Sequence, residues 1–272
     1  MLKNSETFSS FSVSFCFCKH DYLTYAGGAE DEREFDYWEK SEKGPRRWGE
    51  LKEEWAACKN GEMQSPIDLS SRRVSTFGRS SYLRRFYKPS NATVKNRGHD
   101  ISVQWTVGEA GSARINGTEF FLEQGHWHSP SEHSINGRRY AMELHMVHLL
   151  PDHKGKNKAA VIAVLYRIGK PDRFLSLLMK NISSMNDEKG ERHMGVIDPR
   201  EMKLGSRSYY RYMGSLTTPP CTEGVVWIIS RRVRTVSREQ VKLLREVVHD
   251  YAEKNARPLQ PQNEREIHLH VP

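Results

Sequence analysis

The sequence of 272 residues lacks any long hydrophobic run, and this absence argues against a transmembrane helix. No stretch reaches the ~18 apolar residues that a membrane-spanning helix requires. Cysteine is also scarce, with four residues in the chain. No two of them have the spacing of a structural zinc site, which usually closes its ligand shell with thiolates. No repeat, low-complexity tract or second linker follows residue 36, so we expect one domain.

Acidic residues are fewer than basic ones. The chain has 34 Asp and Glu against 42 Lys and Arg, a formal net charge of +8. Such an excess could bind nucleic acid or an anionic surface. The basic residues are dispersed in short pairs, however, such as Arg138-Arg139 and Arg231-Arg232. This pattern is typical of a solvated surface, and we expect no nucleic-acid partner.

The N-terminus predicts a leader over residues 1–28, ahead of a domain over 29–272. Lys3 and the uncharged run "TFSSFSVSFCFC" (7–18) resemble a short signal peptide, but serines dilute the run and no clear cleavage site follows. A serine-rich plastid transit peptide and a wrongly assigned start remain alternatives. We therefore expect the secretory route or the ER lumen, with the chloroplast stroma as the alternative.

Two of the cysteines, Cys16 and Cys18, fall in this leader, which leaves Cys58 and Cys221 as one candidate bridge. If it forms, it closes a loop of about 160 residues, which the chain-entropy model values at roughly 5 kcal/mol. Three glycosylation sequons fit the same oxidising route and begin at Asn91, Asn116 and Asn181.

Strand patterns dominate the rest of the chain. Alternating or continuous apolar segments occur at 99–105, 119–128, 140–149, 160–168 and 225–229. Helical patterns are fewer: one follows Pro171-Asp172, and one follows the capping box Ser237–Gln240 with Val241, Leu244, Val248 and Tyr251 at helical spacing. The sequence therefore predicts a mainly β domain, a large sheet with short peripheral helices.

The segment "QGHWHSPSEH" (124–133) holds the strongest functional signal. On a strand, His126 and His128 point to the same face, and Trp127 points to the other. The turn Asn136-Gly137 suits a hairpin and leads to "ELHMVH", which supplies His145 as a third imidazole. Three neutral nitrogen ligands leave one tetrahedral position open, as catalytic zinc requires.

Neighbouring residues strengthen this prediction. Gln124 and Glu143 lie two residues from His126 and His145 on the same faces, where each could accept a ring N–H and fix the tautomer. His133 and His148 are out of phase or out of reach, and we interpret them as structural histidines.

Two alternatives compete with a catalytic zinc site. The histidines could be polar positions on the solvated face of a sheet. His126, His128 and Glu132 also match the first half of the cupin metal motif, in which the glutamate is a ligand and the metal is often manganese or iron. The second half of that motif is not found.

Longer motifs resemble one family. "GHWHSPSEHSINGRRYAMELHMVH" and "GSLTTPPCTEGVVW" are similar to α-class carbonic anhydrases, closest to the plant branch that includes dioscorin-type storage proteins. "GPRRWGEL", "CKNGEMQSPIDL", "NRGHDISVQW" and "NARPLQPQNER" match in the family's order, from about residue 35 to 267.

The resemblance implies a zinc lyase that interconverts carbon dioxide and bicarbonate, on a mostly antiparallel, ten-stranded twisted sheet. It implies that the metal ligands are His126, His128 and His145, supported by Gln124, Glu143 and the backbone of Asn255. It implies that the Thr217 hydroxyl orients the zinc-bound solvent and donates to Glu132, with His99 as the proton shuttle at the cavity mouth and Tyr37 on its solvent chain. The wall that receives carbon dioxide would be formed by Val147, Val161, Leu216, Thr218 and Trp227, and Cys58 and Cys221 match a disulfide of extracellular members.

Two residues depart from the family pattern. Gly125 stands where a bulky residue is usual, which predicts a looser strand around His126. Arg97 replaces an asparagine common in animal members, and a cation there would disfavour protonated His99. The second functional hypothesis is a catalytically weak storage or binding protein of the same fold. The sequence leaves a monomer or a homodimer open.

Overall fold

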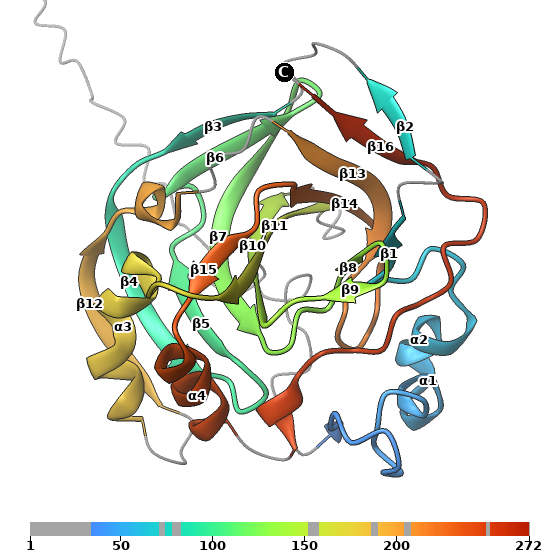
Figure 1. Ribbon diagram of the computed structural model, residues 1–272, viewed down its shortest axis with the longest axis horizontal. Coiled ribbons are helices and arrows are strands. Elements are labelled where there is room, and N and C mark those ends of the chain that lie inside the picture. Colours follow the sequence, from blue (N-terminus) through green and yellow to red (C-terminus); the bar gives the residue numbers. More distant parts are fainter. Residues whose placement is uncertain are drawn as a thin grey trace, which may run out of the picture.

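A computed structural model describes residues 34–70, 74–77, 83–151, 158–185, 190–203, 208–248 and 251–271. The predicted leader, residues 1–28, and the two cysteines in it lie outside the described residues. Figure 1 shows one large curved sheet with helices at its periphery.

The main sheet contains thirteen strands among the described residues, and ten of them form one continuous order, β12-β4-β5-β7-β10-β11-β14-β13-β16-β2. Their bounds are β12 (Glu191–Ile197), β4 (Ser90–Asn96), β5 (Ile101–Trp105), β7 (Thr118–His128), β10 (Met142–Leu150), β11 (Lys158–Ile168), β14 (Glu223–Ser230), β13 (Tyr209–Ser215), β16 (Ile267–His270) and β2 (Val74–Phe77). Neighbours in this order are antiparallel except β11 with β14 and β16 with β2. The prediction of a large, mostly antiparallel sheet is confirmed, and the sheet is mixed.

The remaining strands extend this sheet or form a small one. Off the continuous order lie β3 (Leu83–Tyr87), β6 (Gly111–Ile115) and β15 (Arg234–Val236), the last parallel to β11. A separate three-stranded sheet contains β1 (Asp68–Leu69), β8 (Ser134–Ile135) and β9 (Arg138–Arg139). The predicted hairpin joins β8 to β9 through Asn136 and Gly137, both at positive φ, as a type I′ hairpin turn requires.

The helices are short. They are α1 (Trp48–Leu51), α2 (Ala57–Asn60), α3 (Arg173–Ser183) and α4 (Arg238–Glu246), with 3-10 turns η2 (Glu53–Trp55), η4 (Pro199–Met202) and η5 (Ala252–Lys254). Asp172 caps α3, and the predicted capping box of Ser237 and Gln240 begins α4. Figure 1 shows α3 and α4 together beside β4 and β5. None of the helices in the described ranges is long and apolar enough to cross a membrane.

One sequence prediction about α4 is wrong. The periodic pattern extended to Val248 and Tyr251, but α4 ends at Glu246. Tyr251 has a left-handed backbone (φ 64) and is exposed. Local periodicity could not reveal this end, because the segment that follows is held by long-range hydrogen bonds of Asn255 to the sheet.

The sheet separates two apolar clusters. Trp127 of β7 packs in the cluster on the side of α3, stacked at 6.3 Å on Phe174. Val147, Val161 and Trp227 belong to the cluster on the other side. Because the side chains of a strand alternate, the predicted histidines of β7 project away from Trp127 and into the second side.

Candidate active site

Three histidines converge at the centre of the sheet. His126 and His128 project from β7, and His145 of the antiparallel neighbour β10 lies directly opposite His126. Their ring centroids are 4.5 to 5.2 Å apart. His126 is 9% exposed, and the other two are essentially buried. Register between β7 and β10 therefore places side chains 19 residues apart in the chain at one point.

Each ring has one nitrogen held by a neighbour. The His126 Nδ1 lies 3.0 Å from Gln124 Oε1, and the His128 Nδ1 lies 2.6 Å from the carbonyl oxygen of Asn255. The His145 Nε2 lies 2.9 Å from Glu143 Oε1. Each of these oxygens can accept a ring N–H, which fixes the tautomer and leaves the other nitrogen with its lone pair directed into the cluster.

The open nitrogens fit a metal ion. One ligand atom from each of His126, His128 and His145 can be chosen so that all lie within 4.8 Å of one another. The His128 Nε2 is buried and has no hydrogen-bond partner among the described residues, and such an orphaned acceptor in the interior calls for a ligand. Three imidazole nitrogens are a donor set typical of catalytic zinc.

A second group of potential ligands, His133, Glu143 and His145, has a different explanation. The His133 Nδ1 lies 2.7 Å from Glu143 Oε1, and the same oxygen faces His145 Nε2. These atoms already satisfy one another as hydrogen-bond partners, so they form the support of His145 rather than a second metal site.

Burial favours the neutral form of the imidazoles in the cluster. Burial holds the pKa of His126 well below its ordinary value and also lowers the pKa of His145. Although burial alone would raise it, the pKa of Glu143 is held well below its ordinary value by His133 and His145. An ionised Glu143 is therefore available to accept from both rings.

Glu132 lies behind the histidines and is fully buried. Its Oε1 accepts the backbone N–H of Arg257 at 2.9 Å. Its Oε2 lies 3.6 Å from His128 Nε2 and has no hydrogen-bond partner in the described part of the chain. The predicted hydrogen bond from the Thr217 hydroxyl is therefore not formed in this structure. The structure thus presents an open carboxylate oxygen beside the cluster.

Comparison with known proteins identifies the family. The family model "Eukaryotic-type carbonic anhydrase" matches residues 43–271. "Alpha carbonic anhydrase 7" of Arabidopsis thaliana is 57% identical over 248 residues, which cover 90% of this chain and 88% of that protein. "Carbonic anhydrase Nec1" of Nesocodon mauritianus is 55% identical over 92% of this chain and 90% of that protein. The chain belongs to the α-carbonic anhydrase family. This membership removes the cupin alternative.

A solved structure gives the same result. "Crystal structure of dioscorin complexed with ascorbate" is 44% identical, with a TM-score of 0.82, over 87% of this chain and 97% of that one. The predicted resemblance to the plant branch of the α-carbonic anhydrases is thereby confirmed.

A pocket opens on the histidine cluster of this α-carbonic anhydrase. All five residues predicted to receive carbon dioxide line it together with Thr217, namely Val147, Val161, Leu216, Thr218 and Trp227. Gln124, His126, His145 and Arg97 complete the lining. The sheet therefore brings the predicted apolar wall and the metal-binding face into one cavity.

His99, which the family resemblance predicts as the proton shuttle, is buried in the structure. It is 5% exposed, packs at 5.3 Å against the Phe35 ring, and is absent from the pocket lining, whereas Arg97 is present. The Asp100 carboxylate lies 3.6 Å from His99 Nε2 and also binds Arg97. The predicted repulsion of protonated His99 by Arg97 is therefore offset by a carboxylate between them.

Tyr37 packs edge-on against Trp48 at 5.6 Å and is 6% exposed. Its hydroxyl is buried without a hydrogen-bond partner among the described residues. Burial, reinforced by Glu132 and Asp100, raises its pKa well above the ordinary value. Tyr37 is therefore un-ionised at neutral pH.

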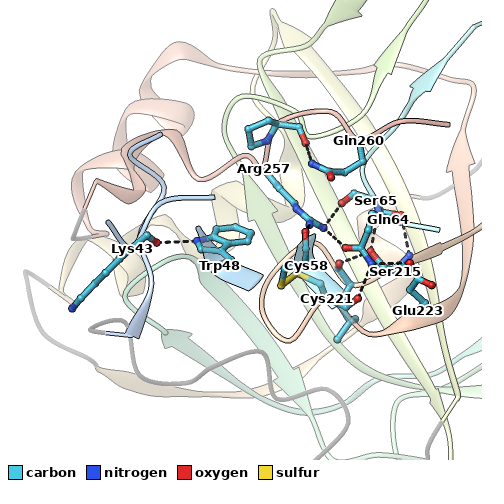
Figure 2. The surroundings of a disulfide bond; sticks show 12 residues. Lys43, Trp48, Cys58, Gln64, Ser65, Ser215, Cys221, Glu223, Arg257 and Gln260 are labelled. Carbon is cyan, nitrogen blue, oxygen red and sulfur yellow. Dashed lines mark hydrogen bonds between the residues drawn. A yellow bond between two sulfur atoms is a disulfide. The ribbon is translucent and has the colours of Figure 1, made fainter. Parts of the chain in front are cut away.

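The predicted Cys58–Cys221 disulfide is confirmed, with a Cα–Cα distance of 5.0 Å. Figure 2 shows Arg257 beside it, a residue that sequence reasoning missed although it lies in the quoted motif "NARPLQPQNER". The Arg257 guanidinium donates to Gln64 Oε1 and to the carbonyls of Ser65 and Cys58, at 2.8 to 2.9 Å. Burial lowers its pKa to about 10. The side chain of Arg257 thus binds the disulfide region, and its backbone N–H binds Glu132.

A buried hydrogen-bond chain behind His145 was also missed. The His133 Nε2 lies 2.7 Å from the Tyr212 hydroxyl, which lies 2.7 Å from Ser65 Oγ. With Glu143, this chain runs from His145 to the segment after α2. Alternation along β13 places Tyr212 inward, but no local pattern identifies its partners.

Gly125 does not leave the strand loose. A Cβ at this position would lie 3.5 Å from the Met202 methyl group and 3.6 Å from Leu144. Met202 is 1% exposed. Met202 of η4 therefore occupies the space beside Gly125, which corrects the expectation of weaker packing around His126.

The sequons remain predictions. Asn91 is exposed on β4, Asn116 is exposed in the turn between β6 and β7, and Asn181 is half-buried in the last turn of α3.

Proposed function

We propose that this α-carbonic anhydrase is a zinc-dependent lyase that interconverts carbon dioxide and bicarbonate. The observation that carries the proposal is the histidine cluster, in which His126, His128 and His145 each present one uncommitted nitrogen. Family membership supports the reaction class.

The three histidines would hold the zinc ion, with Gln124, Glu143 and the Asn255 carbonyl fixing their rings. Bound zinc supplies a water acidic enough to ionise near pH 7, a value established for carbonic anhydrases in general and not obtained from this structure. Neutral imidazoles leave the positive charge of the ion undiminished. Burial, which disfavours protonation of His126 and His145, supports this role.

We assign the orientation of the nucleophile to Thr217 and Glu132. Thr217 lines the pocket and is 5% exposed, and the open Oε2 of Glu132 is an acceptor for its hydroxyl proton. A threonine that donates to a carboxylate can offer only its lone pairs to the pocket. It would therefore accept from the nucleophile and direct the attack.

The apolar wall suits an uncharged substrate. Carbon dioxide has no net charge or strong dipole, so Val147, Val161, Leu216 and Trp227 can hold it by dispersion and exclusion of water. The Thr218 side chain adds one polar group to the same wall.

We propose His99 as the group that passes the proton to solvent, with Tyr37 beside this route. An imidazole with a pKa near 6.5 both accepts and releases a proton at neutral pH. The Asp100 carboxylate at 3.6 Å supports the protonated form. The burial of His99 implies that the ring must move, or that water must reach it, for release to occur.

Replacement of one ligand tests the assignment. His128→Ala should lose zinc and carbon dioxide hydration together, measured by atomic absorption and stopped-flow on the same sample. His193→Ala removes an exposed imidazole from β12 and should retain both. A His128→Ala protein that is free of zinc and still hydrates carbon dioxide would refute the proposal.

A catalytically weak storage or binding protein is the second candidate. It is supported by the similarity to dioscorin, which was crystallised as a complex with ascorbate. The complete histidine set favours the enzyme. Folded wild-type protein with full zinc content and no measurable hydration would favour the storage function.

We also propose the secretory route and a domain boundary near residue 28. The Cys58–Cys221 bridge supports an oxidising compartment, and the family model begins at residue 43. Mass spectrometry of the mature N-terminus and of glycopeptides at the three sequons tests both.

A further inference from the structure

Arg97 gives the pocket a permanent charge. It lies between β4 and β5 and lines the pocket with Gln124, His126 and Thr217. Among the described residues of the lining, Arg97 is the one that stays ionised at every physiological pH. An uncharged gas gains nothing from a guanidinium, so the charge needs another explanation.

The side chain is held in place by Asp100. Arg97 Nε donates to Asp100 Oδ1 at 2.7 Å, and Nη2 donates to Oδ2 at 2.5 Å. The backbone N–H of Arg97 also donates to the Asp100 carbonyl at 2.9 Å. Asp100 is 1% exposed, whereas the Arg97 side chain is 14% exposed. The pair therefore has its acidic member buried and its basic member at the pocket.

This geometry leaves one edge of the guanidinium available. The bidentate contact uses Nε and Nη2, and no described residue accepts a hydrogen bond from Nη1. A guanidinium edge binds the oxygens of carboxylates and related planar anions with directional, charge-assisted hydrogen bonds. Because the side chain is already fixed, little rotamer entropy is lost when an anion binds.

The other ionisable groups near Arg97 do not prevent an anion from binding to its guanidinium. Besides Asp100, the groups that favour its charged form are Tyr37 and Glu123, and the Arg97 charge helps to lower the pKa of His126 after burial has done so. Burial keeps the Tyr37 hydroxyl un-ionised, and burial raises the pKa of Glu123 to about 7. At slightly acidic pH, Asp100 is thus the principal counter-charge.

We propose that Arg97 forms an anion subsite of the pocket, which binds bicarbonate through the free guanidinium edge. The inference rests on the proposed function for the identity of the anion. Carbon dioxide does not use the subsite. Arg97 therefore governs the affinity for the charged partner of the reaction separately from the affinity for the neutral one.

Three variants test the subsite at pH 6.5. Arg97→Gln removes the cation but leaves Asp100 buried without its partner, which could destabilise the fold. Arg97→Gln combined with Asp100→Asn removes both charges, and Asp100→Asn alone keeps the guanidinium. Circular dichroism and zinc content establish that each variant is folded and loaded.

Two readouts separate the subsite from the reaction itself. The first is inhibition of carbon dioxide hydration by bicarbonate and by formate. The second is formate binding to the chelator-treated, metal-free protein, followed by broadening of the formate proton resonance. We expect the double variant to bind both anions about tenfold more weakly, with kcat/KM for carbon dioxide hydration unchanged, and Asp100→Asn to bind them at least as tightly as wild type.

Equal bicarbonate and formate constants in wild type and the double variant would overturn the subsite. An equal loss in the double variant and in Asp100→Asn would also overturn it, because the effect would then follow the loop and not the cation. If wild-type protein lacks zinc or hydration activity, the proposed function fails, and formate binding to the metal-free protein still decides the role of Arg97.

Discussion

Replacement of Glu123 by glutamine should make the protein progressively more stable relative to wild type as pH rises. Glu123 lies on β7 where the pairing with β10 shifts register, between Leu122 and Gln124. Its Oε2 is buried without a hydrogen-bond partner among the described residues. Burial raises the pKa of this carboxyl from 4.5 to about 7, and Arg97 only partly opposes the effect.

The sign of the effect follows from proton binding. The folded chain keeps the Glu123 proton to higher pH than the unfolded chain does, so its stabilising contribution is complete below pH 4.5 and is lost as pH rises through 7. Each tenfold difference in proton affinity is worth about 1.4 kcal/mol. The shift from 4.5 to 7 therefore corresponds to about 3 kcal/mol, and most of it should develop between pH 5 and pH 8.

Urea unfolding at pH 5 and pH 8, in chelator so that metal binding does not contribute, measures this difference. The stability of Glu123→Gln relative to wild type should rise by about 2 to 3 kcal/mol between these values. The constant cost of burying an amide cancels in the comparison. Glu119→Gln on the same strand is the control, because Ser112 lowers the pKa of Glu119 and the group is ionised throughout this range. Parallel stability curves for Glu123→Gln and wild type would refute the reasoning.

Two further predictions concern the disulfide and His99. The double replacement Cys58→Ser and Cys221→Ser should lower the free energy of unfolding by up to about 5 kcal/mol. Wild type in dithiothreitol should unfold at the same urea concentration as the double variant. An unchanged urea midpoint in the double variant would contradict a stabilising role of the disulfide. His99→Ala should slow turnover in weak buffer by up to about 100-fold, with kcat/KM preserved and turnover restored by imidazole. Turnover that does not depend on buffer concentration would exclude His99 as the shuttle.

Local patterns predicted much of the site. Alternation placed His126 and His128 on one face and Trp127 on the other, and the structure agrees. Spacing of two residues also placed Gln124 beside His126 and Glu143 beside His145. These relations hold because neighbours two apart on a strand share a face whatever the rest of the chain does.

Family resemblance predicted the apolar wall of the pocket and the disulfide, but not the buried hydrogen bonds around the site. Arg257 and Tyr212 act through partners more than 70 residues away in the chain, among them Ser65 and His133. Resemblance also gave no role to the Arg97–Asp100 pair between β4 and β5, which brings the Arg97 side chain to the pocket. The role of His99 in proton transfer stays a prediction.

The sequence by itself determined the strands, the tautomer-fixing neighbours of two histidines and the chemical type of the metal site, because each depends on a period of two or on residue identity. Only the tertiary structure decided that His145 lies directly opposite His126, that the Arg257 backbone N–H reaches Glu132, and that Arg97 faces the pocket. The physical reason is that register and loop packing are set by contacts between distant segments, whose free energies no local window of sequence contains.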